Sequence, residues 1–356
     1  MSNSAMSSTA LSSAAERSTG ESITGESITA KLSEATRLAL YRQMTEIRYC
    51  EKRAYDLFLQ NLVKGTSHLA LGHEAVAAGF GVAMNKDDYT FCTYRGHHHT
   101  LARGASMLSV LGELMGRQCG LMKGKGGSMH LTSVEHGVMG SYAIVGAHLP
   151  VAAGAAWSAQ YRGTKQVAVA FFGDGATNIG AFHEALNLAC VWKLPVVFVC
   201  ENNGYMEYTP IRSVTAVEQP AADRAAAYGL PRILIDGNDA EVVYQAACNA
   251  IEQARAGGGP SLIECLTYRH SGHSRADPGK YRPKAEVEEW MKKDPVVVYR
   301  IRLLEAGVAE STLDEIDAEA MATLDAATEA AKASPLPEIA SAYTDVFANG
   351  GAAWRN

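Results

Sequence analysis

Two polar clusters, each rich in oxygen ligands, follow apolar runs in the middle of the sequence. Gly173-Asp174-Gly175 comes directly after the run at 167–172, and Asn203 stands 29 residues after Asp174, behind a second apolar run. Either cluster alone is an ordinary turn sequence. Together, a carboxylate, an amide oxygen and a loop carbonyl at Tyr205 form a set of hard oxygen ligands that suits Mg²⁺ or Ca²⁺. The sequence therefore predicts a divalent cation site at Asp174, Asn203 and Tyr205.

The first of these turns also offers donors for an anion. The pattern after it predicts that Gly175 and Ala176 open a helix, whose free N–H groups and positive dipole end suit a diphosphate. A Rossmann dinucleotide fingerprint would require glycine at the position of Asn178. Nicotinamide binding at this turn is therefore disfavoured.

A guanidinium and a phenol stand beside three consecutive histidines at 97–99. Arg95 can contact phosphate oxygens through two charge-assisted hydrogen bonds, and Tyr94 is a natural second partner. A solvated turn is the plain alternative. A zinc site is the more specific alternative, but three consecutive histidines do not readily bind one metal ion unless the chain turns between them.

Three further polar segments leave their alternatives open at this level. Residues 123–130 form a glycine-rich basic loop, which lacks the spacing of a Walker phosphate loop and on its residues alone is a flexible, anion-friendly turn. Residues 268–278 form a polar loop with two histidines, His270 and His273. A loop histidine is by default a surface residue, and a helix-cap or core role is equally open for His68.

The elements that must position these residues alternate along the chain. Apolar runs at 167–172, 196–200, 232–235 and 261–266 predict buried strands, and helical spacing fills the intervals, with Asp239 as an N-cap. This alternation predicts an α/β fold, a doubly wound parallel sheet with helices on both faces. Ligands of such sheets bind beyond the carboxyl ends of the strands, where the polar clusters fall. Amphipathic helices are expected from 31 to about 62, capping the sheet, and surface helices at 286–304 and 310–333.

Composition excludes several classes of protein. Of the 356 residues, 47% are hydrophobic and 20% are charged, which is ordinary globular usage. A net charge of −6 disfavours nucleic acid as a partner. The seven cysteines are widely spaced, so we expect reduced thiols. The Ser/Thr-rich start is unlike a secretory signal, and the apolar stretch at 142–161 contains His148 and Pro150, so we expect a cytoplasmic protein with no membrane association.

Taken together, the motifs resemble one family. The segment from Gly173 to Asn203 is similar to the thiamine diphosphate motif, and more narrowly to that of the alpha subunit of the decarboxylating component of 2-oxo acid dehydrogenase complexes and of acetoin dehydrogenase. The resemblance runs from about residue 38 to 294. It implies a thiamine diphosphate-binding domain of the diphosphate-binding type over 31–283. The polar, low-complexity start predicts a disordered tail over 1–30, and the pattern after the domain predicts a C-terminal helical extension over 284–356.

The resemblance also implies roles for individual residues. Thiamine diphosphate and Mg²⁺ would be the cofactors, with the magnesium ligands being the Asp174 and Asn203 side chains and the Tyr205 carbonyl. His273 would contact the cofactor and assist acyl transfer, and His68 would line the substrate pocket, so these two are the candidate catalytic residues. Many relatives carry a second histidine at the position of Ser271, whereas this chain has His270. The remaining cofactor contacts implied by the family pattern are Tyr94, Arg95, Ala143, Val145, Gly175 and Ala176.

The implied activity is oxidative decarboxylation of pyruvate or a similar 2-oxo acid, with transfer of the acyl group to the lipoyl domain of an acyltransferase. Cleavage of acetoin by the same cofactor chemistry is the alternative. Only the diphosphate-binding half of the usual site is found here, so two alpha chains are expected to assemble with two beta chains. A transketolase half-enzyme is disfavoured by the loop that ends in Asp277-Pro278. A non-catalytic scaffold is disfavoured because the set of magnesium ligands is intact. A hydrolase that uses the three histidines and a metal would be recognised by its dependence on zinc and its independence of thiamine diphosphate.

Overall fold

The structure, a computed structural model, describes residues 32–63 and 65–345, so the tail expected over 1–30 lies outside the described residues. Its centre is a six-stranded sheet in which every neighbouring pair is parallel. This confirms the predicted fold class. In order across the sheet, the strands are β2 (Val138–Tyr142), β1 (Tyr89–Thr93), β3 (Ala168–Gly173), β4 (Val196–Asn202), β8 (Ser261–Leu266) and β7 (Ile233–Asp236).

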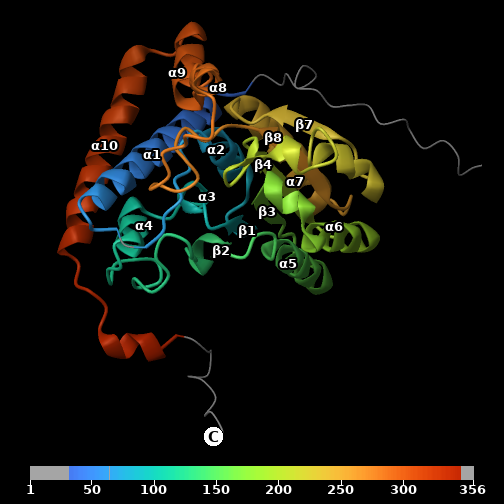
Figure 1. Cartoon of the computed structure of the whole chain (residues 1–356), viewed down its shortest axis with the longest axis horizontal. Coiled ribbons are helices and arrows are strands. Elements are labelled where there is room, and N and C mark those ends of the chain that lie inside the picture. Colours follow the sequence, from blue (N-terminus) through green and yellow to red (C-terminus); the bar gives the residue numbers. More distant parts are fainter. Residues whose placement is uncertain (1–31, 64, 346–356) are drawn as a thin grey trace, which may run out of the picture.

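Both faces of the sheet are covered by helices, because its strands are apolar on both sides. Phe172 and Phe198 point to one face and pack under α5 (His148–Arg162) and α6 (Gly180–Trp192). Phe171 points to the other face, where α2 (Glu74–Ala83) and α7 (Ala240–Arg255) pack. Continuous apolar runs of this kind are typical of parallel strands buried on both faces. Figure 1 shows α5 and α6 on one side of the strands and α7 on the other.

The four predicted strands are all present, with ends shifted by one or two residues, and Asp239 caps α7 through bonds to the backbone N–H of Glu241 and Val242. Strands β1 and β2 were not predicted. They sit beside β3 in the order β2-β1-β3, so the strand order reverses between β1 and β3. At such a reversal the connections leave in opposite directions and open a crevice at the carboxyl ends.

The prediction for the start of α6 was wrong. Residues Asp174–Asn178 form a 3-10 turn, and the α-helix begins at Gly180. Gly175 and Ala176 therefore do not lie at an α-helical N-terminus, and the dipole argument does not apply to them. The Gly175 N–H instead donates to the Asp174 Oδ1 of its own turn, at 2.8 Å.

The N-terminal and C-terminal helices form a separate layer. A single helix, α1 (Glu34–Leu59), packs against α2, α3 (His97–Ala102), α9 (Pro295–Glu305) and α10 (Glu310–Ala333), one layer out from the sheet that it was expected to cap. Figure 1 shows α1 beside α10, so that helices far apart in the sequence lie side by side. The remaining elements are α4 (Met107–Leu114), α8 (Lys284–Met291) and the hairpin β5 (Tyr205–Met206) and β6 (Thr209–Pro210). No described helix is long and apolar enough to cross a membrane.

Candidate functional site

A cavity of about 490 Å³ opens at the carboxyl ends of β1, β3 and β4, where the strand order reverses. Every residue that the sequence analysis selected for the site lines it, although these residues are spread from position 68 to position 273. The cavity walls include His68, Tyr94, Arg95, Ala143, Val145, Asp174, Gly175, Ala176, Asn203, Tyr205 and His273.

The proposed magnesium ligands meet on one wall of this cavity. Asp174 follows β3, Asn203 follows β4, and Gly204, with φ of +79°, turns the chain so that Tyr205 comes next to them. Asp174 is 2% exposed, and its Oδ2 has no hydrogen-bond partner. Burial raises the pKa of this carboxyl to about 6. A buried carboxylate oxygen without a partner is costly, and a bound divalent cation would satisfy it, so these residues fit a magnesium site.

Close packing on this wall explains why Gly175 is glycine. A Cβ at this position would lie 2.6 Å from Cγ of Met206, closer than carbon atoms approach without displacement. Both residues line the cavity. A side chain at position 175 would therefore push Met206 into the space that the cavity offers to a ligand.

Two arginines reach the cavity and both hold the loop that carries His273. Arg95 is 6% exposed and donates to the backbone carbonyls of Leu69 and His273, the latter at 2.8 Å. Arg269, which the sequence analysis did not select, donates from Nη1 to Nδ1 of His273 at 2.9 Å. Burial and the neighbouring Arg269 lower the pKa of Arg95 to about 10, so its guanidinium stays charged near neutral pH.

His273 is held as a neutral imidazole with a defined tautomer. Burial, followed by the charges of Arg95 and Arg269, lowers its pKa to about 4. Because Arg269 has only donors, Nδ1 of His273 must accept, and the ring proton is on Nε2. The ring lies edge-on to His68, with centroids 4.9 Å apart, and His68 in turn contacts Tyr94 at 4.4 Å. Burial also lowers the pKa of His68 to about 2.

The segment after β2 closes the cavity incompletely. Ala143 and Val145 line it, but the Val145 side chain is still 40% exposed and Ile144 is 73% exposed. Exposed apolar side chains beside a ligand cavity are a common mark of an interface. This side of the cavity therefore has the exposed apolar character of an interface.

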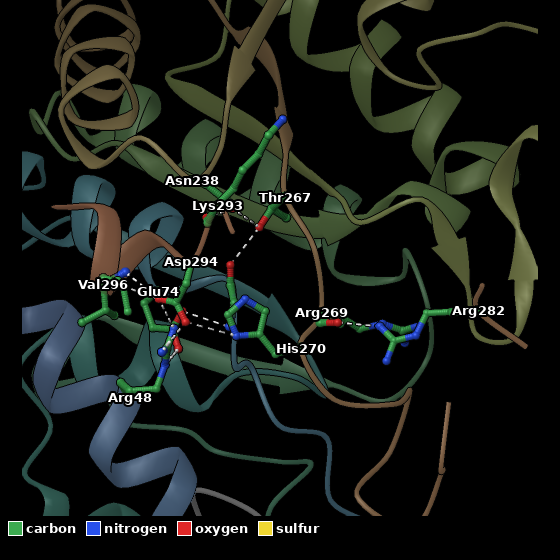
Figure 2. A network of polar contacts seen from close by, with 12 residues as sticks. Arg48, Glu74, Asn238, Thr267, Arg269, His270, Arg282, Lys293, Asp294 and Val296 are labelled. Atoms are coloured by element: carbon green, nitrogen blue, oxygen red, sulfur yellow. Dashed lines mark hydrogen bonds and ion pairs between the residues drawn. The ribbon is translucent and has the colours of Figure 1, made fainter. Parts of the chain in front are cut away.

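A buried network anchors the start of the polar loop (Figure 2). Arg48 of α1 pairs with Glu74 at 2.5 Å and with Asp294 at 2.8 Å, and Nδ1 of His270 lies 3.6 Å from Asp294. Thr267 joins the network by donating to the Gly72 carbonyl. His270, the displaced loop histidine, therefore faces this anchor, and it is absent from the walls of the cavity.

The glycine-rich basic loop already holds an anion. The backbone N–H groups of Met122, Gly124, Gly126 and Gly127 donate to the buried carboxylate of Glu113, at 2.7–3.1 Å. These four donors are therefore engaged within the chain. The loop reaches the cavity through Met129, and Lys125 pairs with Asp345 at 2.9 Å.

The three consecutive histidines of α3 diverge, as expected for neighbours in a helix. His97 contacts Glu51 of α1 at 3.2 Å and the Ser128 hydroxyl at 2.7 Å, so it links α1 to the glycine-rich loop. His98 and His99 turn instead to Glu201 of β4, at 3.0 and 3.4 Å. Burial alone would raise the pKa of Glu201, but these two imidazoles hold it well below its usual value.

One further side chain tied to the site escaped the sequence analysis. Glu286 of α8 accepts hydrogen bonds from the hydroxyl groups of Tyr205 and Tyr268, at 2.9 and 2.8 Å. The sequence of α8 contains no motif that indicates a functional role, so Glu286 could not be selected from the sequence. Arg269 did offer a signal, because it is a cationic side chain three residues after the end of a buried strand.

A parallel sheet with a polar cavity at its strand-order reversal defines an α/β enzyme that binds a cofactor or substrate at its carboxyl edge. The pattern of the dehydrogenase E1 component family matches residues 41–340. The chain is 45% identical over 317 residues to the alpha subunit of acetoin:2,6-dichlorophenolindophenol oxidoreductase from Bacillus subtilis, covering 89% of this chain and 95% of the relative. It is 40% identical over 320 residues to the alpha subunit of the pyruvate dehydrogenase E1 component from Rhizobium meliloti, covering 89% and 92%. The chain belongs to the dehydrogenase E1 component family.

Proposed function

We propose that the chain is the alpha subunit of a thiamine diphosphate-dependent dehydrogenase that oxidatively decarboxylates pyruvate or a similar 2-oxo acid and transfers the acyl group to a lipoyl domain. The observation that carries this proposal is the convergence of the predicted residues on one cavity, with a buried, unpartnered Asp174 oxygen among them. Family membership supports the oxidoreductase class and the cofactor.

The chain's own residues would bind the polar half of the cofactor. Asp174, Asn203 and the Tyr205 carbonyl would hold Mg²⁺, and the ion together with Tyr94 and Arg95 would bind the diphosphate. When bound, thiamine diphosphate supplies an electron sink for the carbon–carbon cleavage that side chains alone do not provide. Arg269 also lines the cavity, and its guanidinium interacts electrostatically with the Asp174 carboxylate.

His273 would transfer or hold a proton at the acyl group during its passage to the lipoyl sulfur. Its neutral ring with the proton on Nε2 can donate one hydrogen bond into the site, which would stabilise negative charge that develops on an oxygen of the acyl group. His68 contacts Tyr94 in a tilted ring arrangement and, as a residue of the cavity wall, would line the substrate pocket.

The alpha designation of the relatives implies a beta subunit as partner. We propose an assembly of two alpha and two beta chains, with the beta chain covering the exposed Ile144 and Val145. The lipoyl domain would reach the cavity past the loop that bears His273.

Co-expression with the beta chain, followed by a dye-reduction assay, tests the proposal. Activity should require both Mg²⁺ and thiamine diphosphate, and turnover of pyruvate or a branched 2-oxo acid should exceed turnover of acetoin. Absence of cofactor-dependent turnover by a correctly assembled complex would refute the proposed enzyme class.

Acetoin cleavage is the second candidate, favoured by the 45% identity to the Bacillus subtilis subunit against 40% to the Rhizobium meliloti subunit. Both substrates are small and carry a carbonyl, and the same cavity residues would bind either. The assay separates them, because turnover of acetoin alone would assign the chain to that branch.

A further inference from the structure

A second set of metal-ligating side chains lies at the back of the cavity. His73, His98 and Glu201 are 1%, 0% and 4% exposed, and one donor atom of each lies within 4.8 Å of the other two. Across the described part of the chain, no other group of three or more His, Cys, Asp or Glu side chains meets that condition. The proposed function makes no use of this cluster.

The fold brings these three residues together from distant positions. His73 is the residue before α2, His98 lies in α3, and Glu201 is near the end of β4, so each is carried by a different element of one packed layer. Because α2 packs against α3, the imidazoles of His73 and His98 come together edge to face, with ring centroids 6.0 Å apart. The cluster is therefore held by rigid elements.

The distances suit a small cation. Nε2 of His98 lies 3.0 Å and Nδ1 of His73 lies 3.4 Å from the same carboxylate oxygen, Oε1 of Glu201. In a tetrahedral zinc site with bonds of about 2.0–2.2 Å, neighbouring ligand atoms are about 3.3–3.5 Å apart. An ion can therefore enter with small side-chain movements.

The ring nitrogens of His73 give an independent indication of a missing ligand. Nε2 of this buried imidazole makes no hydrogen bond, and Nδ1 has only the 3.4 Å contact with Oε1 of Glu201. Buried polar groups in native proteins are nearly always paired, so an unpartnered imidazole beside a carboxylate needs an explanation.

We propose that His73, His98 and Glu201 bind a zinc-type divalent ion, separate from the magnesium site. Two imidazoles and one carboxylate are a donor set that holds Zn²⁺ in proteins. His99 lies 3.4 Å from the other oxygen of Glu201 and orients the carboxylate. Since His73 and Glu201 also line the cavity, the ion would enter through it before the cofactor is bound. This proposal does not depend on the identity of the substrate.

The test is a titration of the chelator-treated alpha–beta complex with Co²⁺, and then with Zn²⁺ as competitor, in the absence of thiamine diphosphate. We expect one equivalent of Co²⁺ per alpha chain with the intense visible absorption of a tetrahedral nitrogen–oxygen site, and loss of that absorption when Zn²⁺ is added. Absence of this signal in the wild-type complex would overturn the proposal.

Four variants locate the ion. His98→Gln should weaken Co²⁺ binding at least 100-fold, and His73→Gln provides a second test if the first variant does not assemble. His183→Gln, which changes an exposed histidine on α6, should bind as the wild type does. Asp174→Asn should keep the tetrahedral signal. If Asp174→Asn abolished the signal while His98→Gln kept it, the ion would belong to the diphosphate site, and the proposal would fail.

Discussion

Asp174 is the residue at which stability and proposed function conflict most. Its Oδ2 is buried and has no hydrogen-bond partner within the chain, an arrangement that a bound divalent cation would relieve. Strained or unsatisfied groups of this kind are tolerated at functional sites and lower the stability of the empty protein. Two opposite effects of one substitution follow.

We expect Asp174→Asn to weaken Mg²⁺-dependent thiamine diphosphate binding by more than about 100-fold, since even groups that only support a metal ligand cost about 10–100-fold when removed. The same change should raise the stability of the cofactor-free complex by about 1 kcal/mol, because a buried unpaired charge is lost. Calorimetric titration and thermal unfolding measure the two effects. Unchanged cofactor affinity would remove Asp174 from the metal site.

His273 should separate the two partial reactions. We expect His273→Ala to slow acylation of a free lipoyl domain by about 100-fold or more, the size of the loss of one hydrogen-bond donor to a developing negative charge, while decarboxylation followed by dye reduction changes by less than about 10-fold. His183→Ala is the control on the surface. Equal losses in both assays would show that His273 acts before the acyl group is formed.

At the scale of elements, carboxylates distant in the sequence hold the loops of the site in place. Glu113 gathers four N–H groups of the glycine-rich loop, and Glu286 joins α8 to the residue that follows Gly204. Neither side chain lines the cavity itself; each fixes the position of a loop backbone instead. Their removal should therefore affect stability or affinity through loop position.

Glu113→Gln should destabilise the complex by about 2–4 kcal/mol, because the amide keeps one acceptor oxygen and turns a donor toward N–H groups that need an acceptor. Urea unfolding of the wild type and the variant measures this. Glu135→Gln, on an exposed part of a nearby turn, should change stability by less than about 0.5 kcal/mol. A similar effect of both substitutions would contradict the bonding described for Glu113.

Glu286→Gln should raise the Mg²⁺ concentration needed for half-maximal activity by about 10-fold, because the amide keeps only one acceptor oxygen for two tyrosine hydroxyls and so weakens the anchor that fixes the Tyr205 backbone carbonyl. The neighbouring Glu288 is exposed and paired only with Lys284, so Glu288→Gln serves as the matched control. If both variants needed the same Mg²⁺ concentration as the wild type, the Tyr205 carbonyl would not depend on α8.

Much of this arrangement was accessible from the sequence, and the exceptions have physical causes. The runs that became β3, β4 and β8 were visible because strands buried on both faces are continuously apolar. Strand β1 reads Tyr-Thr-Phe-Cys-Thr, a short, half-polar run that carries no such signal, and β2 contains Gly140 and Ser141. Arg269 and Glu286 were missed because their partners are fixed by tertiary packing. The roles of the site residues remain predictions.

At the scale of the whole molecule, several buried histidines make the protein sensitive to acid. His148 is fully buried, and its Nε2 lies 2.8 Å from the Phe171 carbonyl. Burial lowers its pKa to about 4. Below the ordinary histidine pKa of about 6.5, the unfolded chain takes up protons that the folded chain does not. Stability is therefore complete above pH 6.5 and falls as the pH decreases toward 4.

We expect His148→Gln to remove about 2 kcal/mol of the stability difference between pH 7 and pH 4.5, since the amide can still donate to the Phe171 carbonyl but does not titrate. Urea midpoints of the two complexes across this range measure the difference. Parallel pH profiles for the wild type and the variant would show that His148 is already protonated when buried.

The packing of α1 against α10 also determines when the surface of α1 is buried during synthesis. Tyr41 of α1 donates to Asp317, 276 residues later, and Arg53 pairs with Asp325. The side of α1 that faces α10 thus emerges from the ribosome early, whereas α10, which buries it, is synthesised near the end of the chain. During that interval the nascent chain carries an uncovered apolar helix, which is the kind of surface that chaperones bind. The alpha chain can offer a finished surface to a beta chain only after its own C-terminal helices have docked.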